Sequence, residues 1–161
     1  MHLERRKRLM DLVLLGIFTA LVTGIAIGVQ STLSGRIGAL IGSFQTGVLM
    51  NAIGGMIAAL IFIALLIAKG KGFWQLPATS LVMLVIAGAL GILIITGVSF
   101  SMQKAGVAVG LATIILGQMV VSLIADAKGW GGGEPIPVTL PRVLGLLVIA
   151  FGVYLLLPKR G

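Results

Sequence analysis

One run of the sequence, from Gly117 to Asp126, carries the polar side chains best placed for chemistry. Gln118, Ser122 and Asp126 are spaced by four residues, so they share one face of a helix. Polar side chains in an apolar helix usually face the protein interior or a water-filled cavity, because lipid cannot hydrogen-bond them. An amide and a hydroxyl can hydrogen-bond a polar solute, and a carboxylate can exchange a proton or a cation. We therefore expect Gln118 and Ser122 to bind substrate and Asp126 to couple an ion or a proton.

Three other apolar segments carry polar residues of the same uncharged kind. The members that we expect to bind substrate with Gln118 and Ser122 are Gln30, Asn51 and Ser99. An architectural interpretation stays open for each of them. Serine often bonds the carbonyl of its own preceding turn, and Gln or Asn can hold helices together by roughly 0.6–2 kcal/mol. Asp126 adjoins Lys128, so its alternative role is that of a solvated helix end.

The chain lacks the residues that several common kinds of catalytic site require. There is no cysteine, and the single histidine, His2, lies in the N-terminal tail. No nucleophile–base set, facing pair of carboxylates or metal-ligand cluster can be assembled from what remains. The glycine-rich run 129–133 lacks the Lys-Ser/Thr pair of a phosphate-binding loop. We expect neither an enzyme nor a cofactor or metal.

The composition indicates the elements that must position these residues. Apolar residues make up 58% of the 161 residues and charged residues 10%, and the mean hydropathy is +1.19. Soluble domains are about 45–50% apolar and about 25% charged, so this chain is expected to be a single domain solvated by lipid. Five runs approach the roughly 20 apolar residues that span a bilayer. They extend from about Leu9 to Leu33, Phe44 to Ala68, Thr79 to Met102, Gly106 to Ala125, and Leu140 or Val143 to Leu157.

Polar breaks separate these five predicted helices. They are Ser34-Gly35-Arg36, Lys69–Gly72, Gln103-Lys104 and the longer loop Asp126–Arg142. The chain also has 24 glycines, and small residues four apart let membrane helices approach closely. The glycines expected to serve helix packing or an interface are Gly24, Gly28, Gly88, Gly91, Gly106 and Gly110.

Positive charge predicts the orientation, because cytoplasmic loops of membrane proteins are enriched in Lys and Arg. With the N-terminus inside, eight basic residues fall on the cytoplasmic side and four on the other. The net charge of +8 is therefore assigned to loops and lipid headgroups, not to nucleic acid. Without the N-terminal cluster Arg5–Arg8 the count is four against four. The body of the protein has almost no orientation preference of its own.

Three motifs resemble those of the YdcZ family of small bacterial inner-membrane proteins in the drug/metabolite transporter superfamily. They are the Gly88-x2-Gly91 pair, the run Gly117-Gln118-x3-Ser122-x3-Asp126, and Arg142-x2-Gly145. Gln30 and the region Ser43 to Gly55 are similar to its first half more loosely. The resemblance implies a multi-pass protein of the bacterial inner membrane that pairs antiparallel, as a homodimer or with a paralogous partner. Such a pair would form a ten-helix bundle of two inverted halves, which is how many carriers achieve alternating access.

These observations favour a small-molecule transporter or exporter that acts as an antiparallel dimer. No Asp, Glu, Lys or Arg is predicted at mid-membrane, so a neutral or zwitterionic substrate is expected. One alternative is a membrane assembly subunit without transport of its own, in which the polar faces would only hold helices together. Another is a lipid-headgroup carrier or membrane enzyme that uses Asp126 and Arg142 at the interface.

Overall fold

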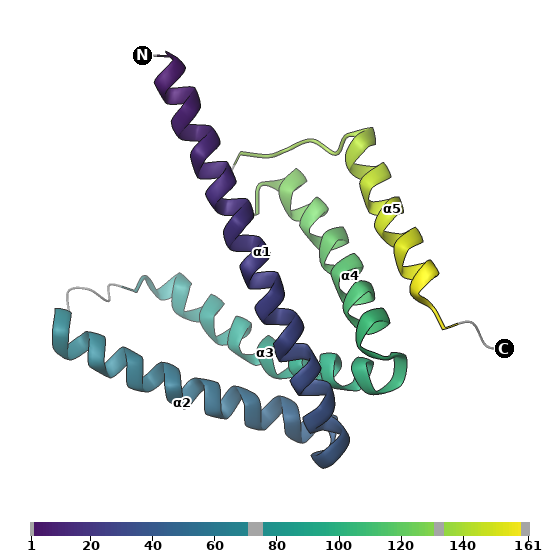
Figure 1. The fold of residues 1–161 in the computed structure, drawn as a ribbon. Coiled ribbons are helices and arrows are strands. Elements are labelled where there is room, and N and C mark those ends of the chain that lie inside the picture. The colour runs from purple at the N-terminus through teal and green to yellow at the C-terminus, as the bar shows by residue number, and fades with distance from the viewer. Residues whose placement is uncertain (1, 71–75, 131–133, 159–161) are drawn as a thin grey trace.

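A computed structural model describes residues 2–70, 76–130 and 134–158, which form five α-helices and no strand within those ranges (Figure 1). The helices are α1 (His2–Ile41), α2 (Ser43–Lys69), α3 (Ala78–Ala105), α4 (Val107–Lys128) and α5 (Leu140–Leu156). Several residues used in the predictions lie outside the described ranges, namely Lys71, Gly72, the glycines 131–133, Lys159 and Arg160.

The lengths and composition of the helices confirm the predicted class of an all-helical membrane protein. Four helices are long and apolar enough to cross a bilayer, and the shortest of them, α4, has 22 residues. At 1.5 Å per residue that helix is about 33 Å long, against a hydrocarbon core of about 30 Å. The apolar helix α5 has 17 residues and is about 25 Å long by the same rise. Thr139 precedes it, and a proline stands in its first turn, where no backbone donor is needed.

Two predicted breaks are wrong. Helix α1 continues through Ser34–Arg36 to Ile41, and α3 continues through Gln103 and Lys104 to Ala105. Basic side chains near a helix end can extend toward the headgroups, so they do not end a membrane helix. The helices end instead at two single glycines, Gly42 with φ 95° and Gly106 with φ 82°. Residues with a side chain rarely adopt a positive φ, whereas glycine does so readily. Each glycine therefore allows the chain to reverse direction within one residue.

The two reversals lie at the same end of the molecule, and the helices spread apart from there (Figure 1). Helices α2 and α3 run side by side away from α1, α4 and α5, while α3 packs on α1 and α4, and α4 packs on α5. The buried side chains gather where the helices meet. They are Ser31 and Ser34 of α1, Thr46 of α2, Val98, Ser99 and Met102 of α3, and Val109 of α4. We call this region the packed end.

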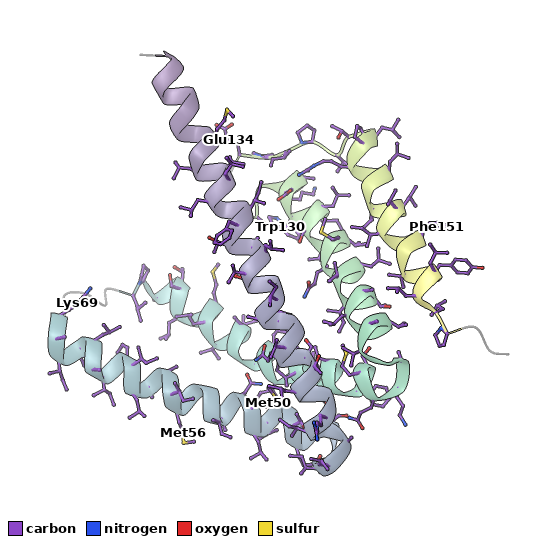
Figure 2. The ribbon with its side chains drawn as sticks, viewed as in Figure 1. Met50, Met56, Lys69, Trp130, Glu134 and Phe151 are labelled. Carbon is purple, nitrogen blue, oxygen red and sulfur yellow. The ribbon has the colours of Figure 1, made fainter. Side chains whose placement is uncertain are left out.

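Beyond the packed end the chain has little interior. No residue is buried in the most apolar stretches of α1, α2 and α3. Met56 on α2 and Phe151 on α5 both lie on outer surfaces and are about 60% exposed (Figure 2). Such exposure has little cost in a bilayer, because lipid tails are as apolar as leucine. It does leave the side chain of Gln30 exposed and without a hydrogen-bond partner among the described residues.

Candidate functional site

An open groove of about 710 Å³ lies between α2 and α3 and reaches α1 at Gln30. It is larger than the hollow of about 290 Å³ that contains Ser122 and Asp126. Besides Gln30, its lining comprises Val48, Met50, Asn51, Ala52, Gly54, Gly55 and Ala58 of α2, and Gly88, Gly91, Ile92, Ile94 and Ile95 of α3. We call it the α2–α3 groove. None of these lining residues carries a formal charge.

Two of the predicted substrate-binding residues, Gln30 and Asn51, line this groove together. The Asn51 amide nitrogen donates a hydrogen bond of 2.8 Å to the Gly47 carbonyl oxygen. Its carbonyl oxygen Oδ1 lies against α3, where a Cβ on Gly91 would be only 2.7 Å away. Asn51 therefore offers an acceptor to the groove, while the exposed Gln30 amide offers both a donor and an acceptor. The pair can hydrogen-bond an uncharged polar group.

Glycine backbone forms much of the groove wall. A Cβ added at Gly54, Gly55 or Gly88 would meet no heavy atom within 4 Å. These positions therefore keep space open within the groove, and only Gly91 among the groove glycines makes a close contact. Gly88 and Gly91 were predicted to serve packing, and that role stays a prediction for Gly88, where an added Cβ would meet no described atom within 4 Å.

Gln118 lies apart from the groove. It is near the middle of α4, its side chain is exposed, and no hydrogen bond joins it to another described residue. The other two members of its face, Ser122 and Asp126, line a smaller cavity of about 290 Å³ between α4 and α5. The predicted face is therefore divided between an exposed amide at mid-helix and a cavity near one end.

We call this smaller hollow the α4–α5 cavity. Asp126 and Arg142 form an ion pair in it, with Arg142 Nη2 donating to Asp126 Oδ2 at 2.7 Å. Their side chains are 44% and 32% exposed, in that order. The second terminal nitrogen, Arg142 Nη1, is buried without a hydrogen-bond partner among the described residues. Coupling through Asp126, which was predicted from sequence, would require the carboxylate to exchange Arg142 for a cation or a proton.

Ser99 has a different environment from the other predicted site residues. It is fully buried at the packed end, and its hydroxyl donates to the Ser34 carbonyl oxygen at 2.9 Å. The Gln103 amide nitrogen donates to Ser43 Oγ at 2.8 Å and to the Ser99 carbonyl oxygen at 3.1 Å. This network joins the ends of α1 and α3 to the start of α2, and within one chain it leaves Ser99 no open face toward either hollow.

The other glycines predicted for packing also differ in their surroundings. A Cβ added at Gly24 or Gly28 would meet no heavy atom within 4 Å, and Gly28 lines a shallow hollow of about 400 Å³ on α1. Gly106 forms the turn between α3 and α4, while Gly110 packs against Met102 and Ser101. A partner for Gly24 and Gly28 therefore has to come from outside the described chain, and their packing role stays a prediction.

Two glycines at which helices approach closely, Gly35 and Gly47, were not predicted from the sequence. A Cβ on Gly35 would be 2.6 Å from Met102 Cβ, and one on Gly47 would overlap Thr96. The signal for Gly35 was a stripe of small residues spaced by three and four, as on one helix face. Its members are Ser31, Ser34, Gly35 and Gly38, and all four are buried.

Comparison with known proteins identifies one family. The model of the family described as "Putative inner membrane exporter, YdcZ" matches residues 15–155. The match includes most of α1, all of α2, α3 and α4, and α5 up to its last residue, together with both hollows and every residue predicted for the site. No curated protein and no solved structure matched the chain.

Proposed function

This chain belongs to the YdcZ family of multi-pass inner-membrane proteins, and from that membership we propose that it is a small-molecule transporter working by alternating access. We further propose that the working unit is a pair of oppositely oriented chains, in which the partner closes the α2–α3 groove. The family description names transport and no enzyme class, which supports a carrier over a catalyst.

The exposed amide of Gln118 is the observation that carries the proposal. It lies about 16 Å from either end of α4, by a rise of 1.5 Å per residue, and no described residue bonds to it. An unsatisfied amide in hydrocarbon costs several kcal/mol. Gln30 is exposed as well, within the α2–α3 groove. A partner chain enclosing a polar cavity would satisfy both amides, whereas lipid would satisfy neither.

The charge distribution supports opposite orientations of the two chains. Outside Arg5–Arg8, basic residues divide four and four between the two sides, so insertion in either direction is nearly equivalent. Two inverted copies generate a two-fold axis in the membrane plane, with a site near the midplane. In our proposal Gln30, Asn51 and Gln118 line that site.

Access to the site would alternate by rocking about the packed end. The reversals at Gly42 and Gly106 are each one residue long, and the α2–α3 pair already spreads away from α1 and α4 beyond them (Figure 1). Rotation of the α2–α3 pair about these two turns would open the groove toward one side of the membrane and then the other.

The substrate is proposed to be neutral or zwitterionic. No Asp or Glu occurs between residues 12 and 125, and the groove lining is uncharged. A central carboxylate that exchanges protons for a cationic substrate is therefore absent from the sequence. Amide groups such as those of Gln30 and Asn51 recognise hydroxyl, amide and ammonium groups by hydrogen bonds.

Flux through liposomes tests the transport proposal. The purified protein is reconstituted into liposomes, and the liposomes are loaded with a panel of labelled sugars and zwitterionic amino acids. We expect efflux of at least one solute, slowed about tenfold by Asn51→Ala or Gln30→Ala because each removes a substrate hydrogen bond. Met56→Ala is the matched control on α2, since its side chain is 61% exposed and outside the groove. Efflux equal to that of empty liposomes for the whole panel would contradict the proposal.

Labelling of single cysteines tests the pairing, and the native chain has none to interfere. Lys69 and Lys104 lie at the ends of α2 and α3, on opposite membrane sides if both helices span. An impermeant maleimide applied to intact cells should label both Lys69→Cys and Lys104→Cys if the chains insert both ways. Labelling of one position only would require a fixed orientation and, for an inverted pair, a different partner chain. Pairing without any flux would favour the assembly-subunit alternative.

A further inference from the structure

The α4–α5 cavity contains polar atoms of charged side chains that no described residue hydrogen-bonds. We propose that it binds a zwitterion with a primary ammonium and an oxyanion, the oxyanion held by Arg142 and the ammonium by Asp126. This site is separate from the α2–α3 groove, and the proposal requires neither transport nor a partner chain.

Arg142 supplies the first half of the argument. A guanidinium has five N–H donors in a planar fork that matches two oxygens of a carboxylate or phosphate. Here Nη2 donates to Asp126 Oδ2, while Nη1 is buried and has no acceptor among the described residues. Buried donors in proteins are nearly always hydrogen-bonded. An oxyanion in the cavity would supply the acceptor that Nη1 lacks.

Asp126 supplies the second half. Its Oδ2 accepts from Arg142, but no described residue donates to Oδ1, and the side chain is 44% exposed. Its backbone carbonyl oxygen already accepts from the N–H groups of Gly129 and Ile136. Those two bonds fix the end of α4 and the following loop against each other. The carboxylate therefore has a free oxygen in a fixed position, as a receptor for an ammonium needs.

The positions of the two charges argue against a role in stabilising their own helices. Asp126 lies in the last turn of α4, where the helix dipole disfavours an anion, and Arg142 lies in the first turn of α5, where it disfavours a cation. An ion pair this exposed contributes little to stability in general. Helix stability thus does not account for the placement of either residue.

The cavity as a whole fits a zwitterion better than a simple ion. An anion alone would be repelled by Asp126, and a cation alone by Arg142, whereas a zwitterion meets both charges favourably. The Asp126 oxygen also needs an N–H donor, which a primary ammonium has and a quaternary ammonium lacks. Ser122 adds a hydroxyl one turn from Asp126. The apolar walls come from Met119, Leu123, Leu146 and Ile149.

Gly145 keeps the floor of the cavity open, because a Cβ there would meet no atom within 4 Å. The site lies at the helix ends, where headgroups of a bilayer begin. The same chemistry could therefore come from a phosphatidylethanolamine headgroup or from a soluble molecule such as phosphoethanolamine. Both carry a primary ammonium and a phosphate.

Native mass spectrometry of the full chain tests binding from both sources. The purified protein is mixed with equal amounts of phosphatidylethanolamine, phosphatidylcholine and phosphatidylglycerol, and separately with phosphoethanolamine alone. We expect about tenfold greater retention of phosphatidylethanolamine than of the other two lipids, or direct binding of phosphoethanolamine. Selective retention of phosphatidylethanolamine without binding of phosphoethanolamine identifies the lipid as the source. Binding of phosphoethanolamine without lipid selectivity identifies a soluble zwitterion.

Three substitutions locate the site. Arg142→Gln should lose about tenfold in retention, since it removes the charged fork. Asp126→Asn should abolish the preference for the primary ammonium over the quaternary one. Gly145→Leu should exclude the ligand by filling the cavity while leaving both charges in place. The matched control is Gly152→Leu, which makes the same change two turns further along the same face of α5 and outside the cavity.

Two outcomes would overturn the proposal. In the first, wild type retains the three lipids equally and does not bind phosphoethanolamine. In the second, Gly145→Leu binds as tightly as Gly152→Leu, which would place any bound ligand elsewhere. Failure of this site leaves the liposome flux test of the α2–α3 groove unaffected, since no residue is shared between the two linings.

Discussion

At the packed end, a methyl group added to Gly47 would overlap Thr96 Oγ1 and lie 2.8 Å from the Ile92 carbonyl oxygen. In the α2–α3 groove, a methyl group added to Gly54 of the same helix would meet no atom within 4 Å. The two glycines are two turns apart on one face of α2. The first lets α2 and α3 touch, whereas the second leaves a space that the chain does not fill.

Polar groups differ between the two regions in the same way. The Ser99 hydroxyl is fully buried at the packed end and bonds across to α1, whereas the Gln30 amide is exposed beside the groove. One chain is therefore sufficient to specify the packed end, but it leaves the groove incomplete. This difference between the two regions is what the proposed pair of inverted chains would require.

Gly47→Ala should have the largest effect on stability, and it tests whether the packed end is as tightly packed as described. The added Cβ would collide with the Ile92 carbonyl oxygen and, at 3.0 Å, with the Thr96 backbone nitrogen. Backbone atoms cannot rotate away, so α2 and α3 must separate, and we expect a loss of about 3 kcal/mol or more. The measurement is unfolding of the purified protein by SDS titration in mixed micelles, followed by helicity. A midpoint equal to wild type would show that the packed end is loose.

The one-residue turns give the next largest effect. Gly106 has φ 82° and ψ 161°, a region that is essentially restricted to glycine, so Gly106→Ala should cost about 1–3 kcal/mol. Gly129 also has a positive φ, but with ψ 20° it is left-handed, where asparagine is tolerated. Gly129→Asn is therefore the control and should unfold near the wild-type midpoint. Equal losses for both variants would mean that the α3–α4 turn is not specially constrained.

The contrast also separates what the sequence could predict from what it could not. Helices and membrane class follow from apolar length, because each helix is set by about 20 local residues. The helix ends were misplaced because basic and polar residues were taken as stops. Arg36 and Lys104 both lie inside helices, whereas the real stops are Gly42 and Gly106. A single glycine followed at once by a new apolar helix was the overlooked signal.

The sequence indicated which polar residue types could line a hollow, but not which of them lie together. Gln30 and Asn51 lie in one groove although they are on different helices, and Gln118, from an equally good pattern, faces neither hollow. The distinction depends on how far α2 and α3 spread from α1 and α4, which no spacing within one helix encodes. Similarly, Gly24 and Gly47 both lie within apolar helical segments, yet of the two only Gly47 closely approaches another helix.

Ser99→Ala should have a smaller effect on stability, and it compares a hydroxyl that bonds between helices with one that bonds within its own helix. It removes a buried hydrogen bond between α3 and α1 and leaves the Ser34 carbonyl oxygen with one bond fewer, so we expect a loss of about 0.5–1.5 kcal/mol. Thr19→Ala is the matched control, since its hydroxyl bonds only the Leu15 carbonyl of its own helix and is exposed. Its effect should be near zero by SDS titration. An equal loss for Thr19→Ala would remove the distinction between bonds within and between helices.

Gly54→Ala should have the smallest effect on stability, and that effect should be opposite in sign to the effect of Gly47→Ala. The new methyl group meets nothing in one chain, and alanine is favoured over glycine in a helix by up to about 1 kcal/mol. The SDS midpoint should therefore stay or rise, while solute flux in liposomes falls because the methyl group occupies the α2–α3 groove. A variant that is more stable and yet a poorer carrier would separate the two regions by function. A lowered midpoint would mean instead that a helix of this chain or of the partner packs against Gly54.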